Sequence, residues 1–375
     1  MNRNVGSLEL IKRINRQLVL DKIKEEQPIS RARIARELSL SKTTVSAICD
    51  DLLDRRMIVD LGEKGPEKGS GRPSKMLGFN PRSACGVGID LHTENAMAVV
   101  TDLNGEVLYR QEAPAVSLPD TIARLAMEVV QHSGMPVEDT IALGVSVPGT
   151  VTQEGVVIRA NRMGWREFDL KGALTKQLPF SVTVNNEANC AALGERWRGT
   201  GGRSDNLYYI ALDGGVGSAI ISEGNLLYGA GCRAGEIGYL LGAGDVEAGR
   251  QNVLGQRGVL EQKIYALLHW EDKGPRQVME DYVRGDEKAR DAVTEFVNLL
   301  SLTVANLVSV LNPETVVIGG SIAQWMEPVL PAIRAIVSSM TPIGTQVVLG
   351  SLGPWAAAIG AVYGALSHTE NENRK

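Results

Sequence analysis

The sequence has few of the residues that stabilise secreted or metal-binding domains. Its four cysteines, Cys49, Cys85, Cys190 and Cys232, stand singly among 375 residues, so there is neither a CxxC metal pattern nor a disulfide framework. We interpret them as reduced, small buried side chains. No run of eighteen apolar residues occurs, and the N-terminus lacks a signal-peptide pattern. We therefore expect a cytoplasmic protein without a membrane partner.

Basic residues are scarce in most of the chain but not at its N-terminal end. The net charge is −5, yet residues 1–82 carry 17 Lys and Arg against 11 Asp and Glu, whereas the remainder carries 22 against 33. The length predicts two to three domains. The charge asymmetry predicts that the N-terminal domain meets a polyanion, although a solvated basic face is the alternative that composition leaves open.

The spacing of apolar side chains predicts three helices near the N-terminus, at 8–24, 31–38 and 42–55. Ser30 and Ser41 stand where they can cap the second and third helices. A turn of only a few residues joins these two helices, and such a pair forms a helix-turn-helix.

The third helix begins with small, polar and basic residues, which suits entry into a DNA major groove. Strands predicted at 57–61 and 75–79 flank a Gly- and Lys-rich loop, as in a wing, and an Arg beside Gly and Pro can enter a narrow minor groove. A protein-interaction domain with a solvated loop is the alternative. The predicted DNA-binding residues are Arg31, Ser41, Lys42, Thr43, Thr44, Ser46, Lys64, Lys68 and Arg72.

Beyond residue 82, the most informative stretch is glycine-rich and spans 206–240. An apolar run at 207–212 predicts a buried strand, and Asp213-Gly214-Gly215-Val216-Gly217 leads from it into a second strand. Glycines beside strand ends suggest that the backbone approaches a ligand closely, and Glu236 in the following loop is a natural acceptor for hydroxyl groups. An ordinary glycine-rich turn would explain this stretch, taken alone, equally well.

Three further segments place this stretch in a family. They are Gly144-Val145-Ser146-Val147-Pro148-Gly149-Thr150-Val151, Asn186-Glu187-Ala188-Asn189 and Val316-Val317-Ile318-Gly319-Gly320-Ser321. In this order the chain from about residue 85 resembles the ROK family of repressors, open reading frames and sugar kinases, and the repressor branch, especially the xylose repressors. The resemblance implies an α/β fold, a two-lobed actin-like ATPase body behind a winged helix-turn-helix at 1–80. The first lobe would span 81–200, with a C-terminal helix at 355–368 packing back on it, and the second lobe 201–354.

The chain departs from the kinases that it resembles at two functional positions. Their first phosphate loop reads Asp-x-Gly-Gly-Thr, whereas this chain has Asp90-Leu91-His92-Thr93-Glu94, in which Glu94 would repel a γ-phosphate. Their general base is the Asp of Glu-Asn-Asp-Ala-Asn, and Glu187 stands at its position with one more methylene. A misplacement of about 1 Å can cost on the order of 10²-fold in rate. We therefore expect no catalytic residue and no cofactor.

The family's structural zinc site is also replaced. Tyr239 stands where the resemblance places its His, and Asn252, Leu254 and Val259 stand at its three Cys positions. Zinc needs those nitrogen and sulfur donors, so we expect no metal. Tyr239 is instead a candidate sugar contact, with a core tyrosine as the alternative. The sugar contacts that the resemblance implies are Asn161, Asn186, Glu187, Glu236, Tyr239 and Glu261.

These observations favour a sugar-responsive transcriptional repressor. It would bind a palindromic operator as a homodimer, with a tetramer left open, and would be released by a monosaccharide held between the lobes. Xylose is the first choice of inducer and glucose the next. Two alternatives are an active ATP-dependent sugar kinase with a DNA-binding domain and a regulator controlled by a protein partner.

Overall fold

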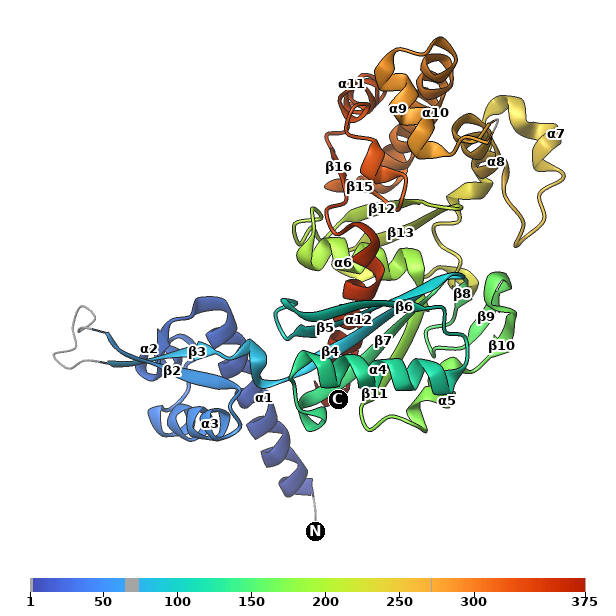
Figure 1. Cartoon of the computed structure of the whole chain (residues 1–375). Coiled ribbons are helices and arrows are strands. Elements are labelled where there is room, and N and C mark those ends of the chain that lie inside the picture. Colours follow the sequence, from blue (N-terminus) through green and yellow to red (C-terminus); the bar gives the residue numbers. More distant parts are fainter. Residues whose placement is uncertain (1–2, 65–73, 271, 375) are drawn as a thin grey trace. The chain divides into compact units, whose positions relative to one another are not determined.

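The computed structural model describes residues 3–64, 74–270 and 272–374 (Figure 1). The chain divides into two compact units. The N-terminal unit comprises Met1–Cys85 with the short segments Asp102–Glu106 and His368–Lys375. The body comprises Gly86–Thr101 and Val107–Ser367.

The described residues of the N-terminal unit form three leading helices and a small antiparallel sheet. Ser30 caps α2 by accepting a hydrogen bond from Arg33 N, and Ser41 caps α3 by accepting one from Thr44 N at 3.0 Å, as predicted. Strand β3 lies between β1 and β2, so a hairpin follows the helix-turn-helix. The elements in chain order are α1 (Arg3–Glu26), β1 (Ile29–Ser30), α2 (Arg31–Glu37), α3 (Lys42–Asp54), β2 (Ile58–Lys64) and β3 (Ser74–Phe79).

Apolar side chains from every element of this unit meet in one core. Helix α1 contributes Val19 and Ile23, and the strands contribute Ile58 and Leu77. In α2 and α3, most of the apolar residues whose spacing predicted the helix lie in or against this core, because each helix turns one apolar face inward. In α1 the pattern holds only in part, since Ile11, Ile14 and Leu18 are exposed. The tip of the hairpin, with the predicted Lys68 and Arg72, lies outside the described residues, as does the side chain of Lys64.

The body contains two five-stranded sheets in the residues that the structure describes (Figure 1). We call the parts built on them the first lobe and the second lobe. The first sheet has the order β11-β7-β4-β5-β6 and consists of β4 (Cys85–Leu91), β5 (Asn95–Asp102), β6 (Val107–Pro114), β7 (Thr140–Val147) and β11 (Ser181–Asn186). The second has the order β14-β13-β12-β15-β16 and consists of β12 (Leu207–Leu212), β13 (Val216–Ser222), β14 (Asn225–Leu226), β15 (Thr315–Gly319) and β16 (Gln346–Leu349). A small sheet of β8 (Thr150–Val151), β9 (Val157–Ala160) and β10 (Trp165–Phe168) extends the first lobe.

Helices cover these sheets and bury their apolar strands. In the second lobe, a large core forms between the sheet and four helices, where Tyr208 and Phe296 are fully buried. Four helices of this lobe, at 246–249, 259–268, 275–284 and 330–340, were not predicted from the sequence. The helices are α4 (Pro119–Ser133), α5 (Leu170–Thr175), α6 (Glu187–Arg198), α7 (Val246–Gly249), α8 (Val259–Leu268), α9 (Pro275–Arg284), α10 (Glu287–Leu311), α11 (Leu330–Met340) and α12 (Ala356–Arg374).

Helices α6 and α12 approach each other closely enough to require glycine. A Cβ at Gly360 would overlap the carbonyl of Cys190, and a Cβ at Gly194 would overlap the carbonyl of Ala356. Such contacts fix the position of α6, because no side chain separates the two backbones. Helix α6 carries Glu187 in its first turn. The position of α6 therefore sets the position of Glu187 in the candidate site described below.

Helix α12 is longer than predicted from the sequence, and α10 has the length and apolar character of a membrane-spanning helix. The prediction that the last helix ends at His368 is wrong, because α12 continues to Arg374. Residues 369–374 contain neither Gly nor Pro to end it, and Glu370 pairs with Lys24 at 3.2 Å. Helix α10 is long and apolar enough to cross a membrane, but half of its most apolar stretch is buried in the body.

Candidate functional site

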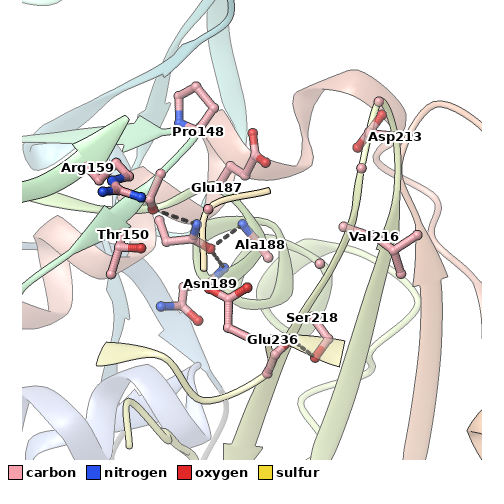
Figure 2. Close-up of a pocket in the computed structure, with 18 of the residues that line it drawn as sticks. Pro148, Thr150, Arg159, Glu187, Ala188, Asn189, Asp213, Val216, Ser218 and Glu236 are labelled. Atoms are coloured by element: carbon pink, nitrogen blue, oxygen red, sulfur yellow. Dashed lines mark hydrogen bonds between the residues drawn. The ribbon is translucent and has the colours of Figure 1, made fainter. Parts of the chain in front are cut away.

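A cavity of ≈ 430 Å³ lies between the two lobes and falls within the usual range of small-molecule pockets, about 300–1,000 Å³. Its walls include the turn after β7, the end of β9, the first turn of α6 and the glycine-rich loop after β12 (Figure 2). Five of the predicted sugar contacts line it together, which are Asn161, Asn186, Glu187, Glu236 and Glu261.

Asn186 positions its neighbour and has little capacity left for a ligand. As the N-cap of α6, its Oδ1 accepts hydrogen bonds from Ala188 N at 2.8 Å and Asn189 N at 3.3 Å. Its Nδ2 donates to the carbonyl of Gly149 at 2.9 Å. The side chain therefore ties the start of α6 to the turn after β7 and holds Glu187 at the cavity wall.

Glu187 is the titratable centre of the site. The pKa of Glu187 is raised from 4.5 to about 7, first by burial and then by the carboxylates of Asp90 and Asp213, against the opposing effect of His92 and Arg162. The carboxyl group is consequently close to half-protonated at neutral pH. It can both donate to and accept from hydroxyl groups, which is the chemistry of a sugar contact.

His92 is a member of this site that the sequence analysis did not assign. Its Nε2 pairs with Asp90 Oδ2 at 2.8 Å, and that hydrogen bond raises the pKa of His92 to about 9. Asp90 is almost fully buried and also accepts a hydrogen bond from Ser146 Oγ at 2.5 Å. A positively charged imidazole therefore stands beside the Glu187 carboxyl group.

Glu236 and Glu261 supply two further carboxyl groups from the second lobe. Glu236 lies near the mouth, and partial burial raises its pKa above 4.5 against the influence of Arg233. Burial likewise raises the pKa of Glu261, opposed first by Arg257, whose Nε lies 3.4 Å from its Oε1. The two lobes thus present carboxyl groups to one cavity, and such groups can accept hydrogen bonds from several sugar hydroxyls.

Tyr239 binds the neighbouring loop instead of lining the cavity. Its hydroxyl donates to Gln256 O at 2.8 Å and accepts from Gly255 N at 2.7 Å. The same loop contacts the first lobe, because Asn161 Nδ2 donates to Gly255 O at 3.2 Å and Arg159 Nη1 donates to Leu254 O at 3.1 Å. Tyr239 therefore holds the shape of a loop that bridges the lobes, which the sequence pattern could not indicate.

Tyr239→Phe should loosen this loop without affecting the sheet beneath it. We expect the free energy of unfolding to fall by about 1–2 kcal/mol, because the Gly255 amide and the Gln256 carbonyl lose their partner. Amide hydrogen exchange should show faster exchange at Gly255. Tyr109→Phe, which removes a hydroxyl bond to Gln111 in the first lobe, is the control. Unchanged exchange at Gly255 in the Tyr239 variant would contradict this role.

The four positions that the resemblance aligns with zinc ligands do not hold side chains that could bind a metal ion together. Tyr239 is occupied as described, and Leu254 and Asn252 lie in the loop that its hydroxyl holds. In the parts of the chain that the structure describes, no three His, Cys, Asp or Glu side chains are grouped to hold a metal ion.

The candidate DNA surface is the start of α3. Lys42 and Thr43 are exposed there, and Thr44 is partly buried. Ser41 is occupied in capping, and its Oγ also lies 2.8 Å from Thr43 Oγ1. Arg31, by contrast, joins α2 to α3, with Nη2 2.7 Å from Asp50 Oδ1 and a weaker hydrogen bond to the carbonyl of Ser46. Lys42 and Thr43 are thus the best-placed candidates among the described residues.

Two sheet-based lobes around a shared cavity define the actin-like, sugar-kinase-type class of fold, and in this chain a helix-turn-helix unit precedes them. The chain belongs to the ROK family, whose model matches residues 86–367. It is 29% identical over 360 residues to the xylose repressor of Caldicellulosiruptor bescii, covering 89% of this chain and 90% of the relative.

Two solved structures show the same fold. One is a ROK family transcriptional regulator described as a homologue of the E. coli MLC protein, with a TM-score of 0.77, 21% identity and coverage of 97% of this chain and 98% of the other. The second is a ROK family glucokinase from Streptomyces griseus in complex with glucose and AMPPNP, with a TM-score of 0.61 and 25% identity. The match covers all of that glucokinase but 76% of this chain.

Proposed function

We propose that the protein is a transcriptional repressor that a sugar releases from its DNA operator. The observation that carries the proposal is the combination in one chain of an exposed helix start, at Lys42 and Thr43, with a cavity of sugar-accepting carboxyl groups, at Glu187, Glu236 and Glu261. The similarity to a xylose repressor extends over 89% of this chain, and that breadth supports the same combination.

The finer features of this proposal follow from the similarity and from general geometry. Xylose is the first choice of inducer and glucose the next. A helix-turn-helix dimer places its recognition helices in successive major grooves, so we propose a homodimer on a palindromic operator. The protein would act in the cytoplasm and need no cofactor or metal.

A kinase activity is the less favoured alternative. The backbone N–H of Ser321 could meet a phosphate oxygen, but it donates to Asp213 Oδ1 at 2.6 Å. The His92 imidazole could also meet a phosphate oxygen, but its Nε2 is paired with Asp90 Oδ2. With Glu187 in place of a shorter Asp, these contacts support a regulator that binds sugar without transferring phosphate.

No phosphorylation of sugars is therefore expected. A coupled assay of ADP release with Mg-ATP and either xylose or glucose should stay at background. Glu187→Asp should not restore turnover, because the shorter acid does not free the Ser321 N–H. Sugar-dependent turnover of the wild-type protein near about 1–100 s⁻¹, the range of typical kinases, would support the kinase alternative instead.

Thermal-shift screening tests the proposed function most economically. Monosaccharides and disaccharides should be screened against the full chain, with and without Mg-ATP, since a ligand that binds the folded state raises its melting temperature. The sugars that shift it should then lower the affinity for a selected operator. A chain that binds DNA but ignores every sugar would refute sugar control.

A further inference from the structure

A second cavity, of ≈ 460 Å³, adjoins the sugar cavity. The two cavities share lining residues, among them His92, Glu187 and Asp213. The far wall of the second cavity is formed by the turn at 320–324 and by the start of α12. A ligand anchored on Glu187 can therefore extend past this residue into further space within the body.

The second cavity is poorly suited to anions. Two cationic side chains, His92 and Arg162, line it, but the carboxyl groups of Asp90, Glu187 and Asp213 outnumber them. Two donors that could hold a phosphate are already paired, since Ser321 N donates to Asp213 and His92 pairs with Asp90. Glu94 adds a further carboxylate to the wall. A phosphate group would meet like charge there and find these donors occupied. The cavity therefore offers space but little that would stabilise a phosphate group.

The rest of the wall suits an uncharged polyhydroxyl group. Thr93 offers a hydroxyl group, and Asn95 and Gln324 offer amide oxygens, since their amide nitrogens already donate to Glu112 and to the carbonyl of Ser321. Apolar surface comes from Met97, Ala191, Pro354, Ala356 and Ala357. A sugar ring presents hydroxyl groups at its rim and C–H groups on its faces. Apolar walls with a few placed polar groups are the usual composition of ligand pockets.

We infer that the effector is a neutral disaccharide, with one ring on the carboxyl groups of the first cavity and the other ring in the second cavity. This inference rests on the proposed function and deepens it, since the xylose or glucose of that proposal becomes one of two linked units. The second ring would also fill the second cavity, which a single sugar bound at Glu187, Glu236 and Glu261 would leave unfilled.

Isothermal titration of the full chain with matched sugars tests the inference. The pairs are xylose against xylobiose, and glucose against cellobiose and maltose. We expect at least one disaccharide to bind about tenfold more tightly than its own monosaccharide, which corresponds to about 1.4 kcal/mol. Glucose 6-phosphate should bind more weakly than glucose, because its phosphate would approach the carboxylates that surround His92.

A substitution at the wall of the second cavity separates this inference from a general effect on the fold. Gln324 is exposed, and its Nε2 bonds locally to Ser321 O at 2.7 Å. Gln324→Trp should narrow the cavity and bring the ratio of disaccharide to monosaccharide affinity close to one. Gln177→Trp is the matched control, because Gln177 is also exposed and bonds locally to Ala173 O, on α5. It should keep the tenfold ratio.

Three results would overturn the inference while leaving sugar control intact. They are a monosaccharide that binds as tightly as every disaccharide, a sugar phosphate that binds more tightly than its neutral sugar, and a Gln324→Trp variant that keeps the full ratio. If no sugar of either size binds, the proposed function fails together with the inference. The titrations therefore distinguish the two failures.

Discussion

Glu236→Ala and Glu187→Ala are expected to bind the operator almost as tightly as the wild-type protein and to remain bound when sugar is added. Saturating sugar should weaken operator binding by the wild-type protein by about 5–150-fold, the usual range of allosteric coupling. In each variant this factor should fall close to one, because a carboxyl group that holds the sugar to one wall of the cavity is missing. Neither substitution should unfold the protein, and removing Glu187 relieves its repulsion with Asp90 and Asp213.

Fluorescence anisotropy of a labelled operator, titrated with and without sugar, measures these factors. Glu247→Ala is the control, because Glu247 lies on α7 of the second lobe and forms an exposed ion pair with Arg250. If the sugar instead activated DNA binding, both variants would bind weakly under all conditions. Release of both variants at the wild-type sugar concentration would show that these carboxyl groups are not the sensor.

Sugar binding can weaken DNA binding only if it changes the conformation of the protein, and closure of the two lobes is such a change. Glu187 follows a strand of the first sheet, whereas Glu236 belongs to the second lobe, so a sugar held by both should draw the lobes together. The chain passes between them near Thr200 and again near Ser351. The buried carboxylate of Glu195 accepts hydrogen bonds from both backbone N–H groups, at 3.0 and 3.2 Å. We propose that closure turns about these two segments and alters the spacing of the recognition helices in a dimer.

The double substitution Lys42→Ala and Thr43→Ala should abolish most specific operator binding. Each lost contact to a base edge costs about 1–3 kcal/mol, so affinity should fall by at least about tenfold. Lys42→Ala alone should lower the slope of the logarithm of affinity against the logarithm of salt concentration by about one, because one phosphate contact releases about one counterion. Sugar affinity of the free protein should be unchanged, since both residues lie in the N-terminal unit.

Anisotropy titrations at several salt concentrations give the affinity and the slope together. Lys176→Ala is the matched control for the loss of one positive charge, since Lys176 is exposed in the body at the end of α5. Ser41 remains to cap α3 in the double variant, so circular dichroism should show no loss of helix. An unchanged affinity and salt slope would show that the start of α3 does not contact DNA.

Features that depend on local sequence were predictable. The helix-turn-helix followed from apolar spacing and from Ser30 and Ser41, and the strand at 207–212 followed from an apolar run beside glycines. Helix α8 was not predicted, although Leu260, Ile264 and Leu268 are spaced as on one helix face, and α12 continues past the predicted end at His368. There the tertiary environment decides, because packing can sustain a helix that its own sequence only weakly favours.

Several of the residues that line the cavity were also predictable, but their individual roles were not. Five of the six predicted sugar contacts line one cavity, yet the Asn186 amide caps a helix and the Tyr239 hydroxyl holds a loop. Both roles depend on backbone groups brought close by the fold, and sequence spacing does not report such groups. The pairing of His92 with Asp90 was missed for a related reason, since its effect depends on the burial of Asp90.

The most direct test of sugar-controlled DNA binding is to measure the dissociation constant of the sugar twice, with the free protein and with the operator-bound protein. Thermodynamic linkage requires the operator to weaken sugar binding by the same factor by which sugar weakens operator binding. We predict that both factors agree and lie between about 5 and 150. Equal dissociation constants for the sugar in the two states would contradict the proposal that this protein is a sugar-released repressor.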